Sequence, residues 1–183
     1  SSAAATKPAA TESYAAQHAG DYATVPLKAD LSAFDDEGKR MIANLVQAAQ
    51  VTDDLYWQQS WSGDRAALLA KAPDDATREL IALNFGPWDR LNEDTPLLPG
   101  IGARPAGLTF YPADMTKDEF EKADLKDKTS WYTLLRRDAA GKLVTVPYHE
   151  AYKADLERAA SLLREAAKHS ADKTFAHYLT MRA

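Results

Sequence analysis

The feature that most constrains the fold is the segment Ala82–Phe120, in which glycines and prolines recur throughout. These residues favour turns, since glycine accepts positive φ angles and proline fixes φ. A connection of this length is uncommon in a compact domain unless it is functional or packs as an ordered surface. Because aromatic residues stand beside the turns, we expect residues 85–115 to form one long, ordered, aromatic and Pro/Gly-rich loop, with walls made by Phe85, Trp88, Phe110 and Tyr111.

Composition excludes several classes of protein. The chain has 183 residues, enough for one sizeable core, and its 45% hydrophobic and 27% charged residues are ordinary for a globular protein. A net charge of −5 argues against a nucleic-acid partner, whose phosphates attract a basic surface. No apolar run approaches the length of about 20 residues that spans a bilayer, so no transmembrane segment is predicted. The absence of cysteine excludes disulfides and thiolate metal sites.

The first 20 residues are rich in Ala, Ser and Thr and offer little apolar surface to bury. We therefore expect residues 1–20 to form a flexible tail, since burial cannot offset the entropy of ordering it. The tail resembles the start of a mature chain after a signal has been removed. It indicates an exported, periplasmic protein, compatible with a lipid anchor at the removed N-terminus. The alternative is a chain that begins at an arbitrary residue.

Two long amphipathic helices are predicted, one on each side of the loop. In the first, over residues 35–60, a stripe at helical spacing runs through Met41, Leu45, Ala48, Thr52 and Leu55, with Ile42, Val46 and Ala49 beside it. Ser32 is the predicted N-cap of this helix. The second spans residues 150–168, with a stripe of Tyr152, Leu156, Ala159, Leu163 and Ala166.

Cap and turn signals predict several shorter helices. Asp64 caps a helix over residues 65–70, Asp74 and Asp75 open a helix that Gly86-Pro87 ends, Thr116 begins a capping box, and Asp172 opens the last helix. Between them, the β-rich runs Trp131–Arg136 and Lys142–Tyr148 flank a turn that ends at Gly141, which predicts a hairpin over residues 131–148. The predicted fold is mainly α with a small β-hairpin (α+β), in one helical domain over residues 21–183.

The histidine spacing does not fit a helical zinc site. Such a site needs two histidines about one turn apart on a helix, with a glutamate beside them. The chain has only His18, His149, His169 and His177, and no pair of them has that spacing. A G-x-S-x-G elbow and a phosphate-binding loop are also missing from the sequence. We predict no catalytic residue, no metal ligand and no cofactor within this chain.

The aromatic residues of the loop have two interpretations. They either fill a core together with Trp57 and Trp61, or they form a wall that faces a substrate, with the polar anchors Asn84, Asp89 and Arg90. Tyr111 is the main candidate, because a tyrosine hydroxyl can donate to a polarised carbonyl while its ring packs. Alternatively, Asp89 and Arg90 form an ion pair that locks the loop.

Four segments carry a resemblance to a known family: VTDDLYWQQSW (51–61), LNFGPWDRL (83–91), RPAGLTFYPADMTKDEF (104–120) and WYTLLRRDAAGKLVTVPYHEAY (131–152). In this order they resemble the N-terminal region of bacterial members of the dipeptidyl peptidase III family of zinc metallopeptidases. The resemblance covers roughly residues 30–183. The pairing of NFGPWDR with GLTFYPADMT is unusual and carries most of its weight.

The resemblance implies the N-terminal, non-catalytic portion of a two-lobed hydrolase that removes dipeptides from oligopeptides with one zinc ion. The zinc motif of that family lies downstream of the matched region, so zinc is expected in the parent protein and this chain alone should be inactive. Its partners would be the oligopeptide substrate and the C-terminal catalytic part of the same polypeptide. The implied substrate-binding residues are Tyr111, which would contact a peptide carbonyl, and Phe110, Asn84, Trp88, Asp89 and Arg90.

Two other functions stay open at this point. One is a stand-alone periplasmic helical module that holds a peptide or a partner protein in its aromatic loop. The other is a metal-free hydrolase that uses Asp89 or Tyr111. A complete module should have a closed apolar surface, whereas a fragment should expose an apolar patch or an unpaired strand edge.

Overall fold

The computed structural model describes residues 12–183. Most of the expected tail, residues 1–11, lies outside the described residues. In the remainder Tyr14–His18 form helix α1 and Ala19–Asp21 form a 3-10 turn, η1, and the Ser13 hydroxyl accepts from Ala16 N at 3.2 Å. In this helix Tyr14 is partly buried and Ala15 is fully buried.

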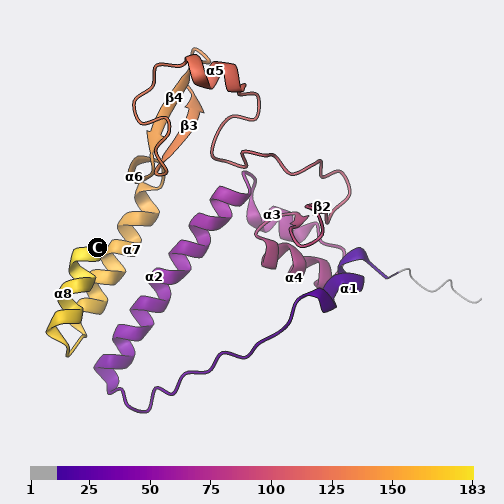
Figure 1. Ribbon diagram of the computed structural model, residues 1–183. Coiled ribbons are helices and arrows are strands. Elements are labelled where there is room, and N and C mark those ends of the chain that lie inside the picture. The colour runs from indigo at the N-terminus through magenta and orange to yellow at the C-terminus, as the bar shows by residue number, and fades with distance from the viewer. Residues whose placement is uncertain (1–11) are drawn as a thin grey trace, which may run out of the picture. The chain divides into compact units, whose positions relative to one another are not determined.

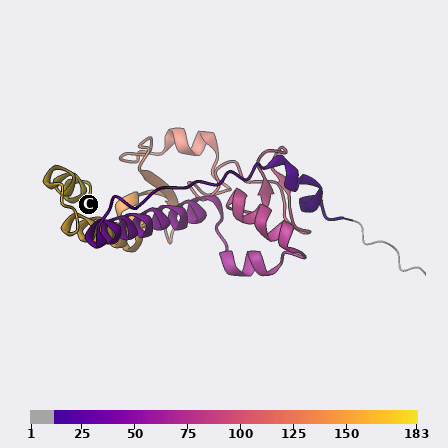
Figure 2. The ribbon, with the colours of Figure 1, turned by 90° about the horizontal axis from the view of Figure 1, so that it is seen from below.

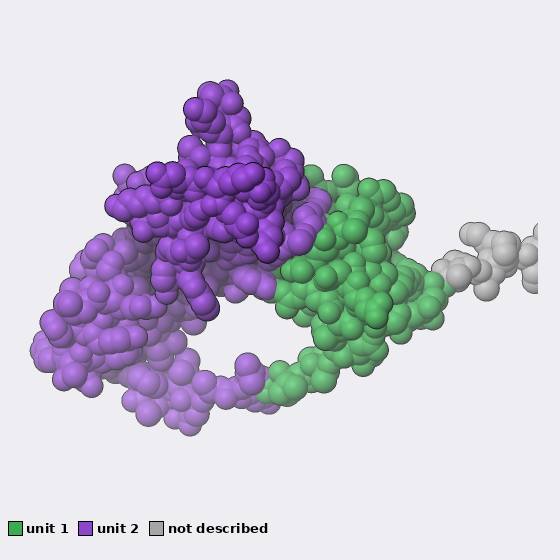
Figure 3. Space-filling model, turned by 45° about the horizontal axis from the view of Figure 1, so that its top comes forward, with its two compact units in different colours: residues 1–26, 63–104 green, residues 27–62, 105–183 purple. Residues whose placement is uncertain are grey.

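The chain forms two compact units where the sequence predicts one domain (Figure 3). The described part of unit 1 comprises residues 12–26 and Gly63–Arg104, and unit 2 comprises Leu27–Ser62 and Pro105–Ala183. The long loop therefore does not belong to a single body, because the boundary between the units falls between Arg104 and Pro105.

Unit 1 is built on the short helices α3 (Arg65–Ala70), which begins after the predicted cap Asp64, and α4 (Asp75–Asn84), which begins in the predicted Asp74-Asp75 segment with Asp74 as its N-cap. Helix α4 ends where expected, but Phe85 adopts the left-handed conformation there (φ 54°) and Gly86 N donates to Ile81 O. The next residues form a small antiparallel sheet that the sequence did not predict, β1 (Trp88–Asp89) with β2 (Thr95–Pro96). The core of unit 1 contains Ala15, Leu68, Leu80, Ile81, Trp88, Leu97 and Leu98.

Unit 2 contains the two long helices, α2 (Asp36–Ser60) and α7 (Lys153–Lys168), packed side by side, with α8 (Lys173–Arg182) folded back along α7 (Figures 1 and 2). The predicted N-cap of α2 is wrong, because Asp35, not Ser32, accepts from the first turn at Gly38 N (2.8 Å). Ser32 N instead donates to Asp30. The predicted cap of α8 is confirmed, since Asp172 Oδ1 accepts from Thr174 N and Phe175 N.

The predicted stripe of α2 is only partly buried. Ala48 is buried as expected, but the other buried positions are Val51, Trp57 and Ser60, whereas Thr52 is exposed and Val46 is 52% exposed. The buried side of the helix is therefore rotated toward the Val51–Trp57 line in its second half. The predicted stripe therefore agrees with the buried face up to Ala48 and departs from it at Thr52.

The hairpin is confirmed, with β3 (Thr133–Arg137) antiparallel to β4 (Leu143–Pro147) and Gly141 at φ 77° in its turn. Leu134, Leu135 and Leu143 are its buried residues. Helix α5 (Lys117–Lys122) precedes the hairpin and begins at the predicted cap Thr116, while α6 (Tyr148–Ala151) joins β4 to α7. The described residues are thus mainly helical, with two small antiparallel sheets, which confirms the predicted fold class.

Candidate functional site

The six predicted substrate-binding residues fall into two groups. Asn84, Trp88, Asp89 and Arg90 belong to unit 1, whereas Phe110 and Tyr111 belong to unit 2. The sequence placed them in one loop, and the structure gives each group its own surroundings. The two groups have different chemistry and are described in turn.

Asp89 is the centre of a buried hydrogen-bond network in unit 1. Its side chain is fully buried, and its carboxylate accepts from the Tyr14 hydroxyl (3.1 Å), the Tyr22 hydroxyl (3.1 Å), Asn92 Nδ2 (2.8 Å) and Leu91 N (3.1 Å). The two tyrosines come from the N-terminal segment, 75 and 67 residues earlier in the chain. Asp89 therefore fastens that segment to the loop.

Asn84 and Trp88 extend this network. Asn84 Oδ1 accepts from Arg90 N at 3.0 Å and its Nδ2 donates to Leu80 O at 2.9 Å, which joins the end of α4 to β1. The buried indole of Trp88 donates from Nε1 to Gly102 O at 2.9 Å, which holds the second half of the loop against the first. These contacts fold the loop back on itself, and they occupy the polar atoms that would otherwise serve as ligand anchors.

The electrostatics of Asp89 favour a structural role. Burial acts to raise its pKa, but hydrogen bonds from Asn92, Tyr22 and Tyr14 outweigh burial and hold the pKa below its usual range. Burial, together with the nearby carboxylate, raises the pKa values of Tyr14 and Tyr22. The Asp89 carboxylate is fully buried and already accepts four hydrogen bonds, so a substrate cannot reach it to transfer a proton. The geometry does not support Asp89 as the general base of a metal-free hydrolase.

Phe110 and Tyr111 line a cavity of about 400 Å³ in unit 2. We call it the Tyr111 pocket. Its walls are mostly apolar, with Thr133 as a polar side chain and two lysines, and its lining residues are Phe110, Tyr111, Met115, Lys117, Phe120, Lys128, Thr133 and Leu135. The pocket thus lies between the end of the loop, helix α5 and strand β3. It can accommodate an apolar side chain next to a hydrogen-bonding group.

Local contacts fix the loop side of this pocket. Leu135 N donates to Phe110 O at 2.9 Å, so Phe110 is tied to the outer edge of β3. The Thr109 hydroxyl donates to the Gln58 carbonyl at 2.9 Å, at the end of α2. Tyr111 lies directly over Gly107, where an added Cβ would come within 2.3 Å of Tyr111 Cε2. Glycine at position 107 is therefore required for the position of the Tyr111 ring.

Two cations fix the α5 side, and the first is Lys128. Its Nζ donates to the carbonyls of Phe120 (2.9 Å), Glu121 (3.1 Å) and Ala123 (2.6 Å), and it lies 5.1 Å from the centre of the Phe120 ring. All three ammonium donors are used, so Lys128 supports the pocket wall and has no donor left for a ligand.

The second cation, Arg137, joins the loop to α5 by ion pairs with Asp114 (2.9 Å) and Glu119 (2.8 Å). Its guanidinium lowers the pKa values of both carboxyl groups, and they raise the pKa of Arg137. Helix α5 and the loop residue Asp114 are therefore both tied to the strand that lines the pocket.

Tyr111 itself keeps a free hydroxyl. Its side chain is half-buried, and no hydrogen-bond partner for its hydroxyl lies within residues 12–183. The ring is positioned by Gly107 while the polar end stays available. This is the arrangement that contact with a ligand carbonyl requires. The structure brings the predicted residues Phe110 and Tyr111 together in one pocket, but sequence reasoning missed Lys128 and Arg137, whose contacts reach residues up to 23 positions away.

Neither a metal cluster nor a membrane-spanning helix is present in the part of the chain that the structure describes. No three His, Asp or Glu residues there lie close enough together to hold a metal ion. His149 lies in α6, His169 follows α7 and His177 lies in α8. None of the helices over residues 12–183 is long and apolar enough to cross a bilayer.

Comparison with known proteins gives one consistent result. The DPP III of Caldithrix abyssi matches 91% of this chain with a TM-score of 0.82 and 36% sequence identity. The dipeptidyl peptidase III of Corallococcus sp. strain EGB matches 92% with a TM-score of 0.83 and 35% identity. The chain is thus similar in sequence and fold to one region of two dipeptidyl peptidase III proteins. This confirms the resemblance inferred from the sequence.

The chain spans only 33% and 34% of the length of those two proteins. A more distant curated relative is Nudix hydrolase 3 of Arabidopsis thaliana, 22% identical over an alignment of 206 positions that covers 79% of this chain and 27% of that protein. No protein-family model matches the chain. The similarity therefore concerns about one third of each of these two longer proteins.

Proposed function

We propose that this chain is the non-catalytic N-terminal portion of an exported, zinc-dependent dipeptidyl peptidase-like hydrolase and supplies part of its peptide-binding cleft. The observation that carries the proposal is the 36% identity to a DPP III over 91% of the chain, combined with coverage of one third of that protein. Catalysis and zinc binding are assigned to the remainder of the parent polypeptide. Export rests on the composition of residues 1–20.

Within the cleft, the Tyr111 pocket receives an apolar side chain of the oligopeptide. Phe110, Phe120 and Leu135 surround that side chain, and the free Tyr111 hydroxyl donates to the adjacent peptide carbonyl. Asn84, Trp88, Asp89 and Arg90 support the loop from unit 1 and contribute to binding through its order. Supporting this division, the polar atoms of Asn84 and Asp89 are already engaged within unit 1, whereas the Tyr111 hydroxyl is not.

The first experiment is the mass of the native gene product in its source cells, detected with an antibody against this chain. A product about three times the 20.1 kDa of this chain is expected from the shared third of the relatives. The product is then incubated with Ala-Ala-Phe-Ala-Ala, with and without 1,10-phenanthroline, and peptides are identified by mass spectrometry. Release of Ala-Ala that stops with the chelator supports the proposal.

Tyr111→Phe in that gene product tests the pocket. Loss of one hydrogen bond should raise KM for the Phe-containing peptide by about two- to tenfold. Tyr132→Phe is the matched control, since Tyr132 is 73% exposed. If neither substitution changes the KM for dipeptide release, the proposed role of Tyr111 is wrong. A native product of 20.1 kDa would instead favour the stand-alone binding module.

A further inference from the structure

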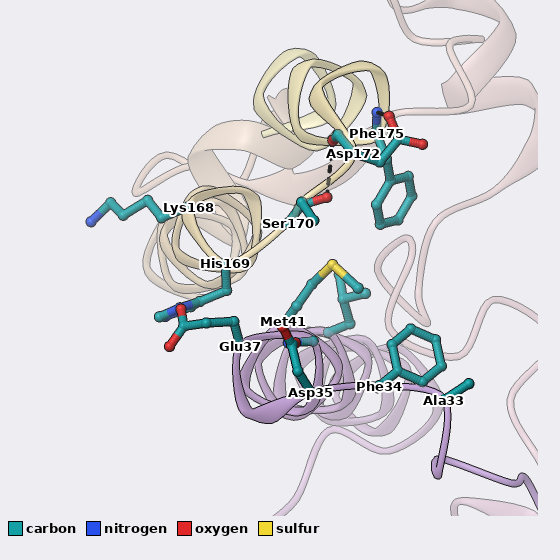
Figure 4. Close-up of a pocket in the computed structure, with 13 residues that line it drawn as sticks. Ala33, Phe34, Asp35, Glu37, Met41, Lys168, His169, Ser170, Asp172 and Phe175 are labelled. Carbon is teal, nitrogen blue, oxygen red and sulfur yellow. Dashed lines mark hydrogen bonds and ion pairs between the residues drawn. The ribbon is translucent and has the colours of Figure 1, made fainter.

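A second, larger groove lies in unit 2, away from the Tyr111 pocket. It has a volume of about 880 Å³ and is bounded by the first turns of α2 and α8 and by the end of α7 (Figure 4). Phe34, Met41, Leu45 and Phe175 provide its apolar surface, with Ala33 and Ala171 beside them. None of the substrate-binding residues proposed above lines it. We call it the Phe34 groove.

The local backbone keeps part of the Phe34 ring exposed in the groove. Phe34 is 40% exposed and precedes α2, with its ring folded onto the first turn of that helix. A Cβ at Gly38 would lie 2.8 Å from Phe34 Cδ1, so glycine permits this position of the ring. In Figure 4 Phe34 and Phe175 project from the α2 and α8 sides of the groove, with Met41 between them. The Phe34 ring is therefore positioned with part of its surface exposed to solvent.

The charges at the rim are not balanced. His169 lies 2.7 Å from Glu37 and 3.4 Å from Glu165, and Lys168 lies 2.6 Å from Glu165, so both basic rim residues already have acidic partners. The helix caps Asp35 and Asp172 each use only Oδ1 for their own helix. Within residues 12–183 their Oδ2 atoms have no hydrogen-bond partner. The groove thus combines an apolar floor with two carboxylate oxygens that can accept from a cation.

We propose that the Phe34 groove is the docking surface for another segment of the same parent polypeptide, an apolar stretch with a flanking lysine or arginine. Its apolar side chains cover Phe34, Met41 and Phe175, and its cation binds Asp35 or Asp172. This inference rests on the proposed function, because it takes the occupant from the part of a dipeptidyl peptidase III-like protein that this chain does not contain.

The size of the relatives favours this occupant over a second copy or a separate protein. The chain spans 33% and 34% of the two solved proteins, so two thirds of such a polypeptide remains to be placed. A covalently linked segment docks at a high effective concentration and needs little intrinsic affinity.

The absence of cysteine gives a direct test. Ala33→Cys places a thiol at an exposed position in the groove, and Ala139→Cys places a control thiol in the exposed hairpin turn. The rate of iodoacetamide alkylation at each position is measured by peptide mass spectrometry in residues 1–183 alone and in the longer gene product. We expect the thiol at position 33 to react about tenfold more slowly in the longer product, because the groove must open before the thiol reacts. The control should react equally in both.

The charge component is tested with Asp35→Asn plus Asp172→Asn, which keeps both N-caps because asparagine caps as well as aspartate. In the longer product this change should increase the alkylation rate at position 33, whereas Asp118→Asn on the exposed surface of α5 should not. A photo-crosslinker at position 33 should then link to an apolar segment of the same chain that contains a lysine or arginine.

Other outcomes would overturn the docking proposal separately from the proposed function. If the longer product releases Ala-Ala but alkylation at position 33 is as fast as in residues 1–183 alone, the groove is not covered by the parent. If protection appears in residues 1–183 alone and increases with concentration, the occupant is a second copy. If the native product is only 20.1 kDa, both the docking proposal and the proposed function fall.

Discussion

Asp89 shows how one buried carboxylate can determine the order of a whole segment. Its four donors come from α1, from the residue after η1 and from the turn that follows β1, so the N-terminal segment depends on it. Asp89→Ala should lower the free energy of unfolding by about 1–3 kcal/mol, because it leaves buried donors without an acceptor. Urea unfolding followed by tryptophan fluorescence measures this. Glu79→Ala, an exposed change on α4, is the control and should have little effect.

The same carboxylate gives unit 1 an acid-sensitive component. In the native protein the pKa of Asp89 lies below its usual range because hydrogen bonds outweigh burial, whereas in the unfolded chain it returns to about 3.9. The unfolded state therefore binds more protons in this range, and stability falls as pH falls. We expect the urea midpoint to be constant well above about pH 4 and to drop as pH decreases through the native pKa. In Asp89→Asn the drop should be smaller, and an equal drop in both proteins would contradict this assignment.

At this scale the structure gives the predicted substrate-binding residues two kinds of surroundings. Asp89 and Asn84 were candidates for ligand contact because polar groups beside aromatics are typical of binding sites. Their partners Tyr14 and Tyr22 lie more than 60 residues away, and no spacing rule relates them. Tyr111 differs, since its surroundings arise from nearby residues such as Gly107, and its predicted position beside Phe110 in an apolar wall agrees with the pocket.

At the scale of elements, local chemistry determined what the sequence could predict. Asp64, Asp74, Thr116 and Asp172 each accept from the first turn of their helix, so these starts follow from side-chain chemistry alone. The start of α2 agrees with the predicted range, but its N-cap was misassigned because Ser32 and Asp35 are both good caps and only the fold selects between them. The β1–β2 sheet was missed because two-residue strands have no period to detect.

The turn before Tyr111 provides a test at this scale. Gly107→Ala should displace the Tyr111 ring, since the new Cβ would lie 2.3 Å from it, and should weaken binding of Ala-Phe-Ala-Ala several-fold while α2 and α7 stay folded. Calorimetric titration of the longer gene product and circular dichroism measure the two effects. Gly102→Ala in the same loop is the control, because no atom lies within 4 Å of its added Cβ. Equal binding by the two variants would show that the position of Tyr111 does not matter.

At the scale of the whole molecule, the sequence predicted one domain where there are two units. Helix α2 is continuous in sequence with α3 and α4, which suggests a single helical body. Its packing partner is α7, however, far later in the chain, and α4 instead packs against α1 from the start of the chain. Amphipathic patterns indicate that a helix has a partner but do not specify which one. The division into Gly63–Arg104 with the N-terminal segment and the remainder therefore needed the tertiary structure.

Zinc dependence belongs to this largest scale, because under the proposed function it should differ between this chain and the proposed parent protein. The described residues contain no group of three potential ligands, and the histidines in α6, at the end of α7 and in α8 are not gathered. A metal stabilises a protein only by binding its native state more tightly than its unfolded state. For residues 1–183, EDTA should therefore leave the urea midpoint unchanged, and zinc should not co-elute on gel filtration. In the longer gene product the same treatment should abolish dipeptide release, and added zinc should restore it.

Two results together would contradict the assignment of zinc to the remainder of the parent. They are a zinc-dependent rise in the urea midpoint of residues 1–183 and the co-elution of one zinc ion per chain on gel filtration.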